Sequence, residues 1–208
     1  MRGKLGVILL FTSFRLLSLA HCEDHFLTPH EILSMDNLEL LISQDEIKNK
    51  IADAARVLDA QYEGEELTIV MVMKGALCIT ADLIRALKTP CIIESVTASS
   101  YGKRGTKRGE LQISGLEEID LSSKNVLLVD DIFDSGQTLS QIFAKLKQKN
   151  PKSLKSLVLL VKNVKRDTTY LPDYALFDIE NLFVIGYGLD YKEHYRGLPG
   201  IYFFSGEP

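Results

Sequence analysis

The chain of 208 residues is poor in cysteine and has no long hydrophobic run. Its three cysteines, Cys22, Cys78 and Cys91, are an odd number and match no zinc-binding spacing. A disulfide framework is therefore not expected, and this cysteine usage fits a reducing compartment. The net charge of -4 gives no overall reason to expect a nucleic-acid partner, which would need a local basic patch.

The first residues differ from the rest of the chain. They begin with Arg2 and Lys4, continue with an apolar run from Leu5 to Phe14, and resemble a secretory signal. Arg15 ends this run well short of the about 20 apolar residues that a bilayer-spanning helix needs. We interpret residues 1–36 as a hydrophobic leader or upstream extension outside the fold, and a true secretory signal is the alternative.

The remaining residues, 37–208, are expected to form one domain, because 46% hydrophobic content is enough for one sizeable core. Helical and strand-like patterns alternate along it. Ser43 and Glu46 form a capping-box pattern, and the apolar residues that follow lie on one helical face. Strands are predicted at 67–73, 91–99, 125–130 and 156–162, and further helices at 76–87 and 138–150.

This alternation predicts an α/β fold with a mainly parallel twisted sheet flanked by helices. Ligands of such sheets bind at the carboxyl ends of the strands. The stretch "VLLVDDIFDSGQT" is the most informative of these ends. We expect the strand to give way to the loop at Asp130 and the helix to begin at Thr138. Backbone N–H groups and hydroxyls in this turn would suit a phosphate, and the aspartates would suit ribose hydroxyls or a divalent cation.

The same stretch resembles the phosphoribosyl pyrophosphate motif of the type I phosphoribosyltransferases. That resemblance implies their fold, including a small hood subdomain built from the N- and C-terminal segments of the domain. It further implies that Asp130 and Asp131 hold the ribose hydroxyls. The turn that cradles the 5′-phosphate would consist of Asp134, Ser135, Gly136, Gln137 and Thr138.

Two further loops resemble those of the hypoxanthine-guanine phosphoribosyltransferases. Lys74 and Gly75 follow the first predicted strand and resemble the loop that receives pyrophosphate, where a cis peptide between the pair is expected. Ser100 and Tyr101 resemble the start of the mobile catalytic loop. The glycine-rich, basic segment that continues to Glu110 is interpreted as a lid that excludes water from a polyanionic substrate.

The C-terminal part carries the features of a base-binding site. Lys162 can donate a hydrogen bond to the exocyclic oxygen of a 6-oxopurine, and Phe183 can stack on the base. "FVIGYGLDY" resembles the family pattern "FVVGY-x-LDY", so Val184 is also expected at the base. By the same resemblance, Asp190 lies near a metal site and Arg196 contacts substrate.

The resemblance implies purine salvage: the phosphoribosyl group of phosphoribosyl pyrophosphate moves to N9 of hypoxanthine or guanine. Asp134 would be the catalytic general base at N7, provided that its surroundings raise its pKa. Mg²⁺ is the expected cofactor, with Asp190, Asp130 and Asp131 near it. The products would be inosine or guanosine monophosphate and pyrophosphate.

Two alternatives remain open at this point: a xanthine-preferring phosphoribosyltransferase, and an RNA-binding regulator built on the same fold. The expected partners are phosphoribosyl pyrophosphate and a 6-oxopurine base, with no nucleic acid and no membrane for the core domain. The resemblance implies a homodimer or homotetramer, and we expect a cytoplasmic location.

Overall fold

The structure is a computed structural model that describes residues 37–101, 110–166 and 168–205. The chain divides into two units, Met1–Met35 and Asp36–Pro208, and all described residues belong to the second. The expected leader therefore lies outside the described residues. None of the helices in the described part is long and apolar enough to cross a membrane.

A six-stranded sheet forms the centre of the domain, with the spatial order β4-β3-β2-β5-β6-β7. Its strands are β2 (Leu67–Met73), β3 (Cys91–Tyr101), β4 (Glu110–Ser114), β5 (Asn125–Phe133), β6 (Ser153–Lys162) and β7 (Tyr174–Ile179). All neighbours are parallel except β3 and β4, which pair as an antiparallel hairpin. The mainly parallel α/β sheet predicted from the sequence is confirmed.

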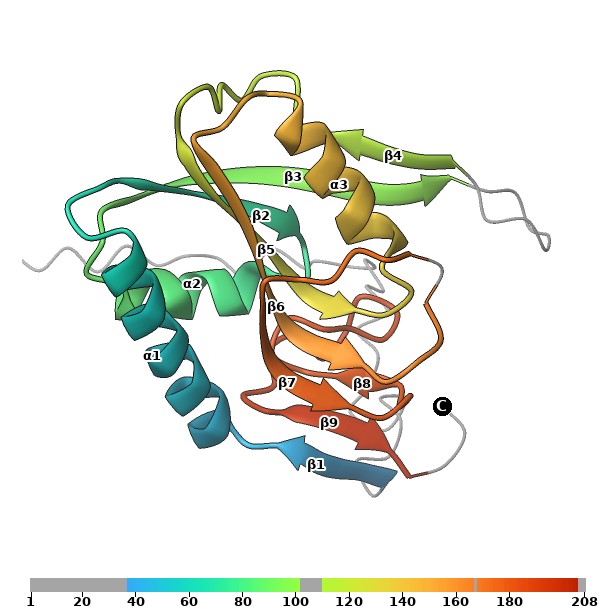
Figure 1. Cartoon of the computed structure of the whole chain (residues 1–208). Helices are drawn as coiled ribbons and strands as arrows, with labels where there is room; N and C mark the ends of the chain where they lie inside the picture. Colours follow the sequence, from blue (N-terminus) through green and yellow to red (C-terminus); the bar gives the residue numbers. More distant parts are fainter. Residues whose placement is uncertain (1–36, 102–109, 167, 206–208) are drawn as a thin grey trace, which may run out of the picture. The chain divides into compact units, whose positions relative to one another are not determined.

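Helices cover both faces of this sheet (Figure 1). Helices α1 (Gln44–Gln61) and α2 (Leu77–Ala86) pack on one face, and α3 (Gln137–Lys147) packs on the other. Because successive side chains of a strand point to opposite faces, Leu127 joins the α1/α2 core while Leu128 joins the α3 core. Burial on both sides explains why β2 is apolar at every position except Thr68.

The start of α1 agrees with the sequence pattern. The Ser43 hydroxyl accepts a hydrogen bond from the backbone N–H of Glu46, and the Glu46 carboxylate accepts one from the backbone N–H of Ser43. This capping box satisfies N–H groups that have no partner inside the helix. The expected apolar face is buried: Ile47, Ile51, Ala55, Leu58 and Tyr62.

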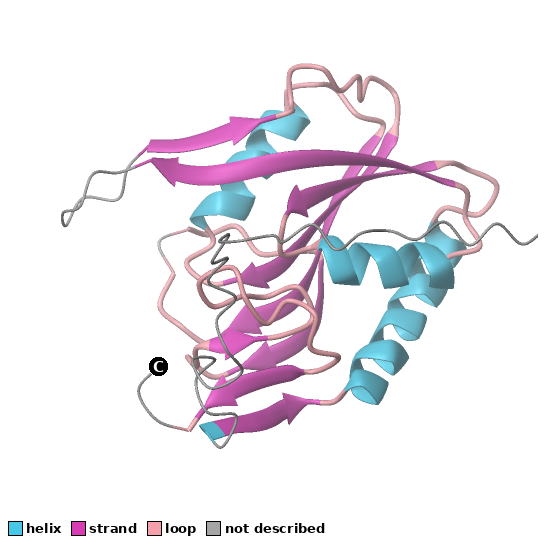
Figure 2. Cartoon of the chain, turned by 180° about the vertical axis from the view of Figure 1, so that it is seen from behind, coloured by secondary structure: helices cyan, strands magenta, loops and turns pink. Residues whose placement is uncertain are grey.

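A second, three-stranded sheet combines the two ends of the domain. It has the order β1-β9-β8, with β1 (Leu38–Ile42), β9 (Ile201–Phe204) and β8 (Val184–Ile185). Leu38 pairs with Phe204, so residues from opposite ends of the domain lie side by side. Figure 2 shows this small sheet beside the β7 edge of the main sheet.

The chain reverses its direction of travel across the main sheet between β2 and β5. From β2 it passes through α2 to β3 on one side, whereas β5 pairs with the other side of β2 and leads through α3 to β6. Such a switch point opens a crevice at the carboxyl ends of its two strands, where α/β proteins bind ligands. The crevice lies after Met73 and Phe133, the last residues of β2 and β5.

Several predicted boundaries were wrong by a few residues. Strand β5 continues to Phe133, so Asp130 and Asp131 lie in the strand and not in the loop, because parallel pairing with β6 extends to Phe133 and Val161. Helix α3 begins at Gln137, one residue before Thr138. Strand β6 begins at Ser153, three residues before the predicted start, and ends at Lys162 as predicted.

Candidate active site

Three segments meet at the switch point, and two glycines make the contacts possible. A Cβ atom on Gly75 would lie 1.7 Å from Oδ2 of Asp131, so the loop after β2 rests directly on the acidic end of β5. A Cβ atom on Gly188 would lie 2.2 Å from the carbonyl oxygen of Gly75. Gly188 also has a φ of +101°, a conformation that other residues rarely adopt. The structure thus brings the predicted pyrophosphate loop, the acidic pair and the segment after β8 together.

The acidic pair is held in place by the backbone of β5. Oδ1 of Asp130 accepts a hydrogen bond of 3.0 Å from the N–H of Asp131, and Oδ1 of Asp131 accepts one of 2.9 Å from the N–H of Ile132. Burial raises the pKa of Asp130 well above its ordinary value, and the charge of Asp131 raises it further. Burial also raises the pKa of Asp131. Two adjacent carboxyl groups in this setting favour a proton, a hydroxyl donor or a cation as a partner.

The turn after β5 leads into α3 through a residue that provides no side-chain cap. Gly136, the N-cap residue, has a φ of +78° and makes no side-chain capping hydrogen bond, and the first turn of α3 contains no acidic residue. The unpaired N–H groups of a helix N-terminus and its partial positive charge bind phosphate. Gly136 is required sterically, because its Cβ would lie 2.6 Å from Cγ2 of Thr168 and 2.7 Å from Cζ of Phe133. The predicted phosphate turn, Asp134 to Thr138, therefore has suitable geometry.

Lys162 and Asp134 face each other across the ends of β6 and β5. Nζ of Lys162 lies 3.9 Å from Oδ2 of Asp134, and the lysine side chain is 13% exposed whereas the aspartate is 53% exposed. A nearly buried cation beside an accessible carboxylate presents one donor and one acceptor to a ligand on the same side.

Arg166 is a neighbour that the sequence reasoning missed. Its Nη2 donates a hydrogen bond of 2.8 Å to the carbonyl oxygen of Lys162, and its guanidinium lies 5.3 Å from the ring centre of Phe133. These contacts fix the chain just after Lys162. Its spacing of four residues from Lys162 was the only signal available, since the contact forms in an irregular segment.

A group of aromatic side chains lies beside the three-stranded sheet. The ring of Phe183 is 6.3 Å from that of Phe204 and 5.7 Å from that of Tyr191, measured between ring centres. Phe183 is nevertheless 46% exposed, whereas Val184 is buried in β8. A supported yet accessible ring can stack on a planar ligand.

Lys74, Asp190 and Arg196 converge from two segments. Nη2 of Arg196 lies 2.8 Å from Oδ1 of Asp190, and Nη1 of Arg196 donates a hydrogen bond of 2.7 Å to the carbonyl oxygen of Gly188. Glu193, which the sequence reasoning did not select, contacts both Lys74 and Arg196. The expected cis peptide is present but lies one bond earlier, between Met73 and Lys74, so the prediction of a Lys74–Gly75 cis bond was wrong.

The predicted lid is described only at its base. Tyr101 pairs with Glu110, and Ser100 pairs with Leu111, so the β3–β4 hairpin continues to the point where the lid begins. The basic residues of the predicted lid lie outside the described residues: Lys103, Arg104, Lys107 and Arg108.

The described residues offer no ready-made metal cage, because no three His, Cys, Asp or Glu side chains among them converge on one point. They do fit a magnesium ion that arrives with a phosphorylated substrate, since Mg²⁺ keeps several waters and takes one or two protein carboxylates besides phosphate oxygens. Asp130, Asp131 and Asp190 are the carboxylates at this edge. Within the described residues, neither Asp130 nor Asp131 has a lysine or arginine at ion-pair distance.

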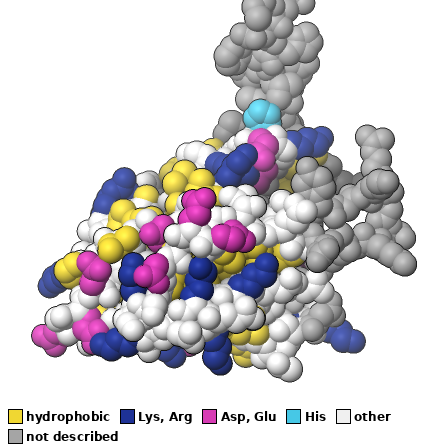
Figure 3. All heavy atoms as spheres, turned by 90° about the horizontal axis from the view of Figure 1, so that it is seen from above, with side chains coloured by type: hydrophobic (Ala, Val, Ile, Leu, Met, Phe, Trp, Pro, Cys, Tyr) yellow, Lys and Arg dark blue, Asp and Glu magenta, His cyan; other side chains and the backbone are white. Residues whose placement is uncertain are grey.

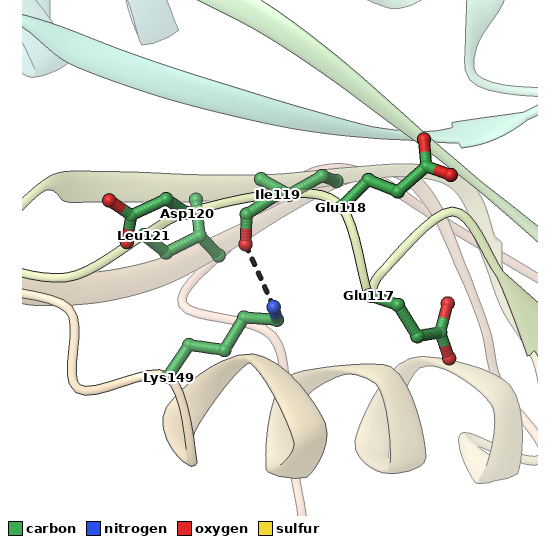
Figure 4. Close-up of a pocket in the computed structure, with 6 residues that line it drawn as sticks. All are labelled: Glu117, Glu118, Ile119, Asp120, Leu121 and Lys149. Atoms are coloured by element: carbon green, nitrogen blue, oxygen red, sulfur yellow. Dashed lines mark hydrogen bonds between the residues drawn. The ribbon is translucent and has the colours of Figure 1, made fainter.

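A separate hollow of about 340 Å³ lies between the β4–β5 connection and the end of α3. Figure 4 shows that the carboxylates of Glu117, Glu118 and Asp120 point in different directions there. Lys149 donates a hydrogen bond of 2.8 Å to the carbonyl oxygen of Ile119. Among the described residues that line this hollow, no set of side chains converges on one point.

A helix start that has no side-chain cap, an acidic strand end at a switch point and an accessible aromatic ring are features of the nucleotide-binding α/β enzymes. The phosphoribosyl transferase domain family matches residues 43–192. The hypoxanthine-guanine phosphoribosyltransferase of Aquifex aeolicus is 37% identical over 79% of this chain and 93% of its own length. The hypoxanthine phosphoribosyltransferase of Salmonella typhimurium is 38% identical over 78% of this chain and 92% of its own length.

A solved structure supports the same assignment. Hypoxanthine phosphoribosyltransferase from Trypanosoma cruzi, in complex with the product IMP, is 34% identical and superimposes with a TM-score of 0.73 over 79% of this chain and 92% of that one. The chain belongs to the hypoxanthine-guanine phosphoribosyltransferase family. The type I phosphoribosyltransferase fold and the enzyme class expected from the sequence, a glycosyltransferase of purine salvage, are thereby confirmed.

Proposed function

We propose that the chain transfers the phosphoribosyl group of phosphoribosyl pyrophosphate to N9 of hypoxanthine or guanine. The observation that carries this proposal is the position of Lys162, 3.9 Å from Asp134 at the ends of two adjacent strands. A lysine can donate to O6 of a 6-oxopurine, and the neighbouring carboxylate can accept the proton from N7. Adenine has an amino group at position 6, which cannot accept from the lysine.

The other site residues bind the remaining parts of the two substrates. Phe183 stacks on the base beside Val184, and the carboxylates of Asp130 and Asp131 accept hydrogen bonds from the ribose hydroxyls. The 5′-phosphate binds the turn formed by Asp134, Ser135, Gly136, Gln137 and Thr138. Ser100 and Tyr101 begin the lid that excludes water. The accessible face of Phe183 and the uncapped start of α3 support these roles.

In the reaction, purine N9 forms a bond to C1 of the ribose while the bond from C1 to the pyrophosphate oxygen breaks. Asp134 takes the N7 proton, so the purine becomes electron-rich as it attacks. Lys74 and Arg196 bind the departing pyrophosphate through charged hydrogen bonds. Mg²⁺, held near Asp190 and the Asp130–Asp131 pair, would neutralise charge on the leaving group when bound.

We infer a cytoplasmic homodimer or homotetramer. The cysteine usage and the family support the location, and exposed apolar side chains support self-association. Leu77 is 51% exposed at the start of α2, and Ile92 and Ile93 are 37% and 39% exposed in β3. Light scattering of the purified chain measures its mass, and fractionation of cells that produce the full chain tests the location against the secretory alternative.

The RNA-binding alternative has less support. On the face displayed in Figure 3, lysine and arginine side chains are interspersed with aspartate and glutamate, so it presents no single-sign basic surface. RNA binding without chemistry depends on such a surface, because phosphate contacts dominate its affinity.

A base-panel assay tests the proposed function. The full chain, and in parallel a version that starts at Met35, is supplied with Mg²⁺, phosphoribosyl pyrophosphate and one of hypoxanthine, guanine, xanthine or adenine. We expect nucleotide from hypoxanthine or guanine and none from adenine. Highest turnover with xanthine would establish the xanthine-preferring alternative. Donor binding without turnover of any base would contradict the proposal.

A further inference from the structure

Glu193 bridges two cations that belong to different segments. Its Oε2 lies 2.9 Å from Nζ of Lys74, in the loop after β2, and 3.3 Å from Nη2 of Arg196, in the segment after β8. Lys74 and Glu193 are 119 residues apart in sequence. A single carboxylate oxygen thus joins two loops that meet at the switch point.

These cations are the two that bind pyrophosphate in the proposed function, so Glu193 and pyrophosphate need the same donors. Nη1 of Arg196 binds the carbonyl oxygen of Gly188, Nη2 also contacts Asp190, and Nε is buried without a hydrogen-bond partner. A phosphoryl oxygen that approaches Nη2 therefore has to replace one of its two carboxylate partners. Glu193 is the accessible one, with a side chain 64% exposed against 30% for Asp190.

The backbone directs Glu193 toward this position. Lys192 and Glu193 both have left-handed φ values, +50° and +68°, which are uncommon for residues other than glycine. The N–H of Glu193 donates a hydrogen bond of 2.8 Å to Oδ2 of Asp190, and Tyr191 and His194 form a β-bridge around the turn. The turn is thus fixed at both ends, whereas the exposed carboxylate can rotate into solvent without disturbing the core.

We propose that Glu193 is an internal competitor of pyrophosphate: its carboxylate occupies part of the pyrophosphate position in the substrate-free chain and leaves when donor or pyrophosphate binds. The proposal rests on the proposed function. In the free chain Glu193 keeps Lys74 and Arg196 near each other and compensates their charge. Because it is tethered to the site, it also competes with bound pyrophosphate at a high effective concentration and so promotes product release.

The test is Glu193→Gln, which keeps the size of the side chain and removes its charge. In calorimetric titration, Glu193→Gln is expected to bind magnesium pyrophosphate about three- to tenfold more tightly than the parent chain does, because the variant lacks the exposed carboxylate that competes for the two cations. The difference is expected to shrink at high salt, because exposed charges are screened. The KM for phosphoribosyl pyrophosphate is expected to fall in parallel, whereas kcat stays the same or falls as pyrophosphate release slows.

Glu118→Gln is the matched control, because Glu118 is an exposed glutamate in the β4–β5 connection. It is expected to leave pyrophosphate binding unchanged. Glu193→Ala provides a second charge-removing variant, and thermal unfolding establishes that each variant is folded. Equal or weaker pyrophosphate binding by both Glu193 variants would overturn the proposal. Absence of turnover by the parent chain in the base-panel assay would instead reject the proposed function.

Discussion

Gly75 and Asp131 are in contact across the switch point in an arrangement that only a glycine permits. A Cβ atom at position 75 would lie 1.7 Å from Oδ2 of Asp131 and 2.3 Å from Cγ. The carbonyl oxygen of Gly75 is in turn covered by Gly188. The position of the pyrophosphate loop, the direction of the acidic pair and the path of the segment toward Arg196 are therefore coupled through a few backbone contacts.

Replacement of Gly75 by alanine is expected to displace either the loop or the Asp131 carboxylate. Misplacement of reacting groups by about 1 Å can cost about 100-fold in rate, so we expect kcat/KM to fall by about that factor. Steady-state kinetics with saturating base measures the effect. Gly197→Ala is the control, since a Cβ atom on Gly197 meets nothing within 4 Å and it should retain activity. Full activity of Gly75→Ala would mean that the contact is unimportant.

Asp130→Asn is expected to stabilise the substrate-free protein at neutral pH. The folded chain holds the Asp130 proton more tightly than the unfolded chain, whose pKa is near 3.8. The stability that this proton provides is fully present below that pKa and is lost as pH rises through the raised pKa of the folded state. Each unit by which the pKa is raised corresponds to about 1.4 kcal/mol in the free energy of unfolding. Each kcal/mol of unfolding free energy corresponds to about 2–4 °C in Tm for a chain of this size.

Thermal unfolding across a pH series measures this effect. The advantage of Asp130→Asn should be small near about pH 4 and grow toward neutrality. Asp178→Asn, at an exposed position of β7, serves as the control and should show no such growth. Turnover of the Asp130 variant should fall, because one acceptor for the ribose hydroxyls is weakened. A variant less stable than the parent at neutral pH would contradict burial as the source of the raised pKa.

The parts of the fold that were predictable from the sequence have local causes. The limits of β2 were predicted without error, because a strand buried on both faces is apolar at every position but one, Thr68, and is flanked by polar residues. The capping box at Ser43 was predictable because its two partners are three residues apart. The phosphate turn was recognisable because its glycine, hydroxyls and helix start follow one another along the chain.

The missed features depend on distant partners. Acidic residues are rare in strands, so a loop was predicted at Asp130 and Asp131. In the structure they belong to β5, because the pairing with β6 continues to Phe133 and Val161. Strand β1 forms only because β9, at the other end of the domain, pairs with it. The contacts of Glu193 require a left-handed turn and a loop 119 residues away, and neither has a local sequence signal.

Asp134→Asn tests the general base. Asparagine keeps the shape of the side chain but does not accept the N7 proton, so kcat is expected to fall by about 100- to 10,000-fold. Binding of phosphoribosyl pyrophosphate should stay within about threefold of the parent, because the phosphate is held by the backbone of the turn and not by this carboxylate. Single-turnover kinetics and donor titration measure the two effects separately. Unchanged turnover would remove Asp134 from this role.

Lys162→Ala tests the choice of base. Its Nζ is the nearly buried donor beside Asp134, and loss of a charged hydrogen bond costs about 1.5–3 kcal/mol. We therefore expect the KM for hypoxanthine and guanine to rise about 10- to 100-fold, while donor binding changes little because Lys162 lies on the base side of the site. Lys165→Ala, which replaces an exposed lysine three residues further along the chain, is the matched control and should retain the parent KM.

Lys162→Ala should also discriminate less strongly against adenine, since it lacks the side chain that requires an oxygen at position 6 of the base. An unchanged base KM in Lys162→Ala would show that the oxopurine is selected by other groups.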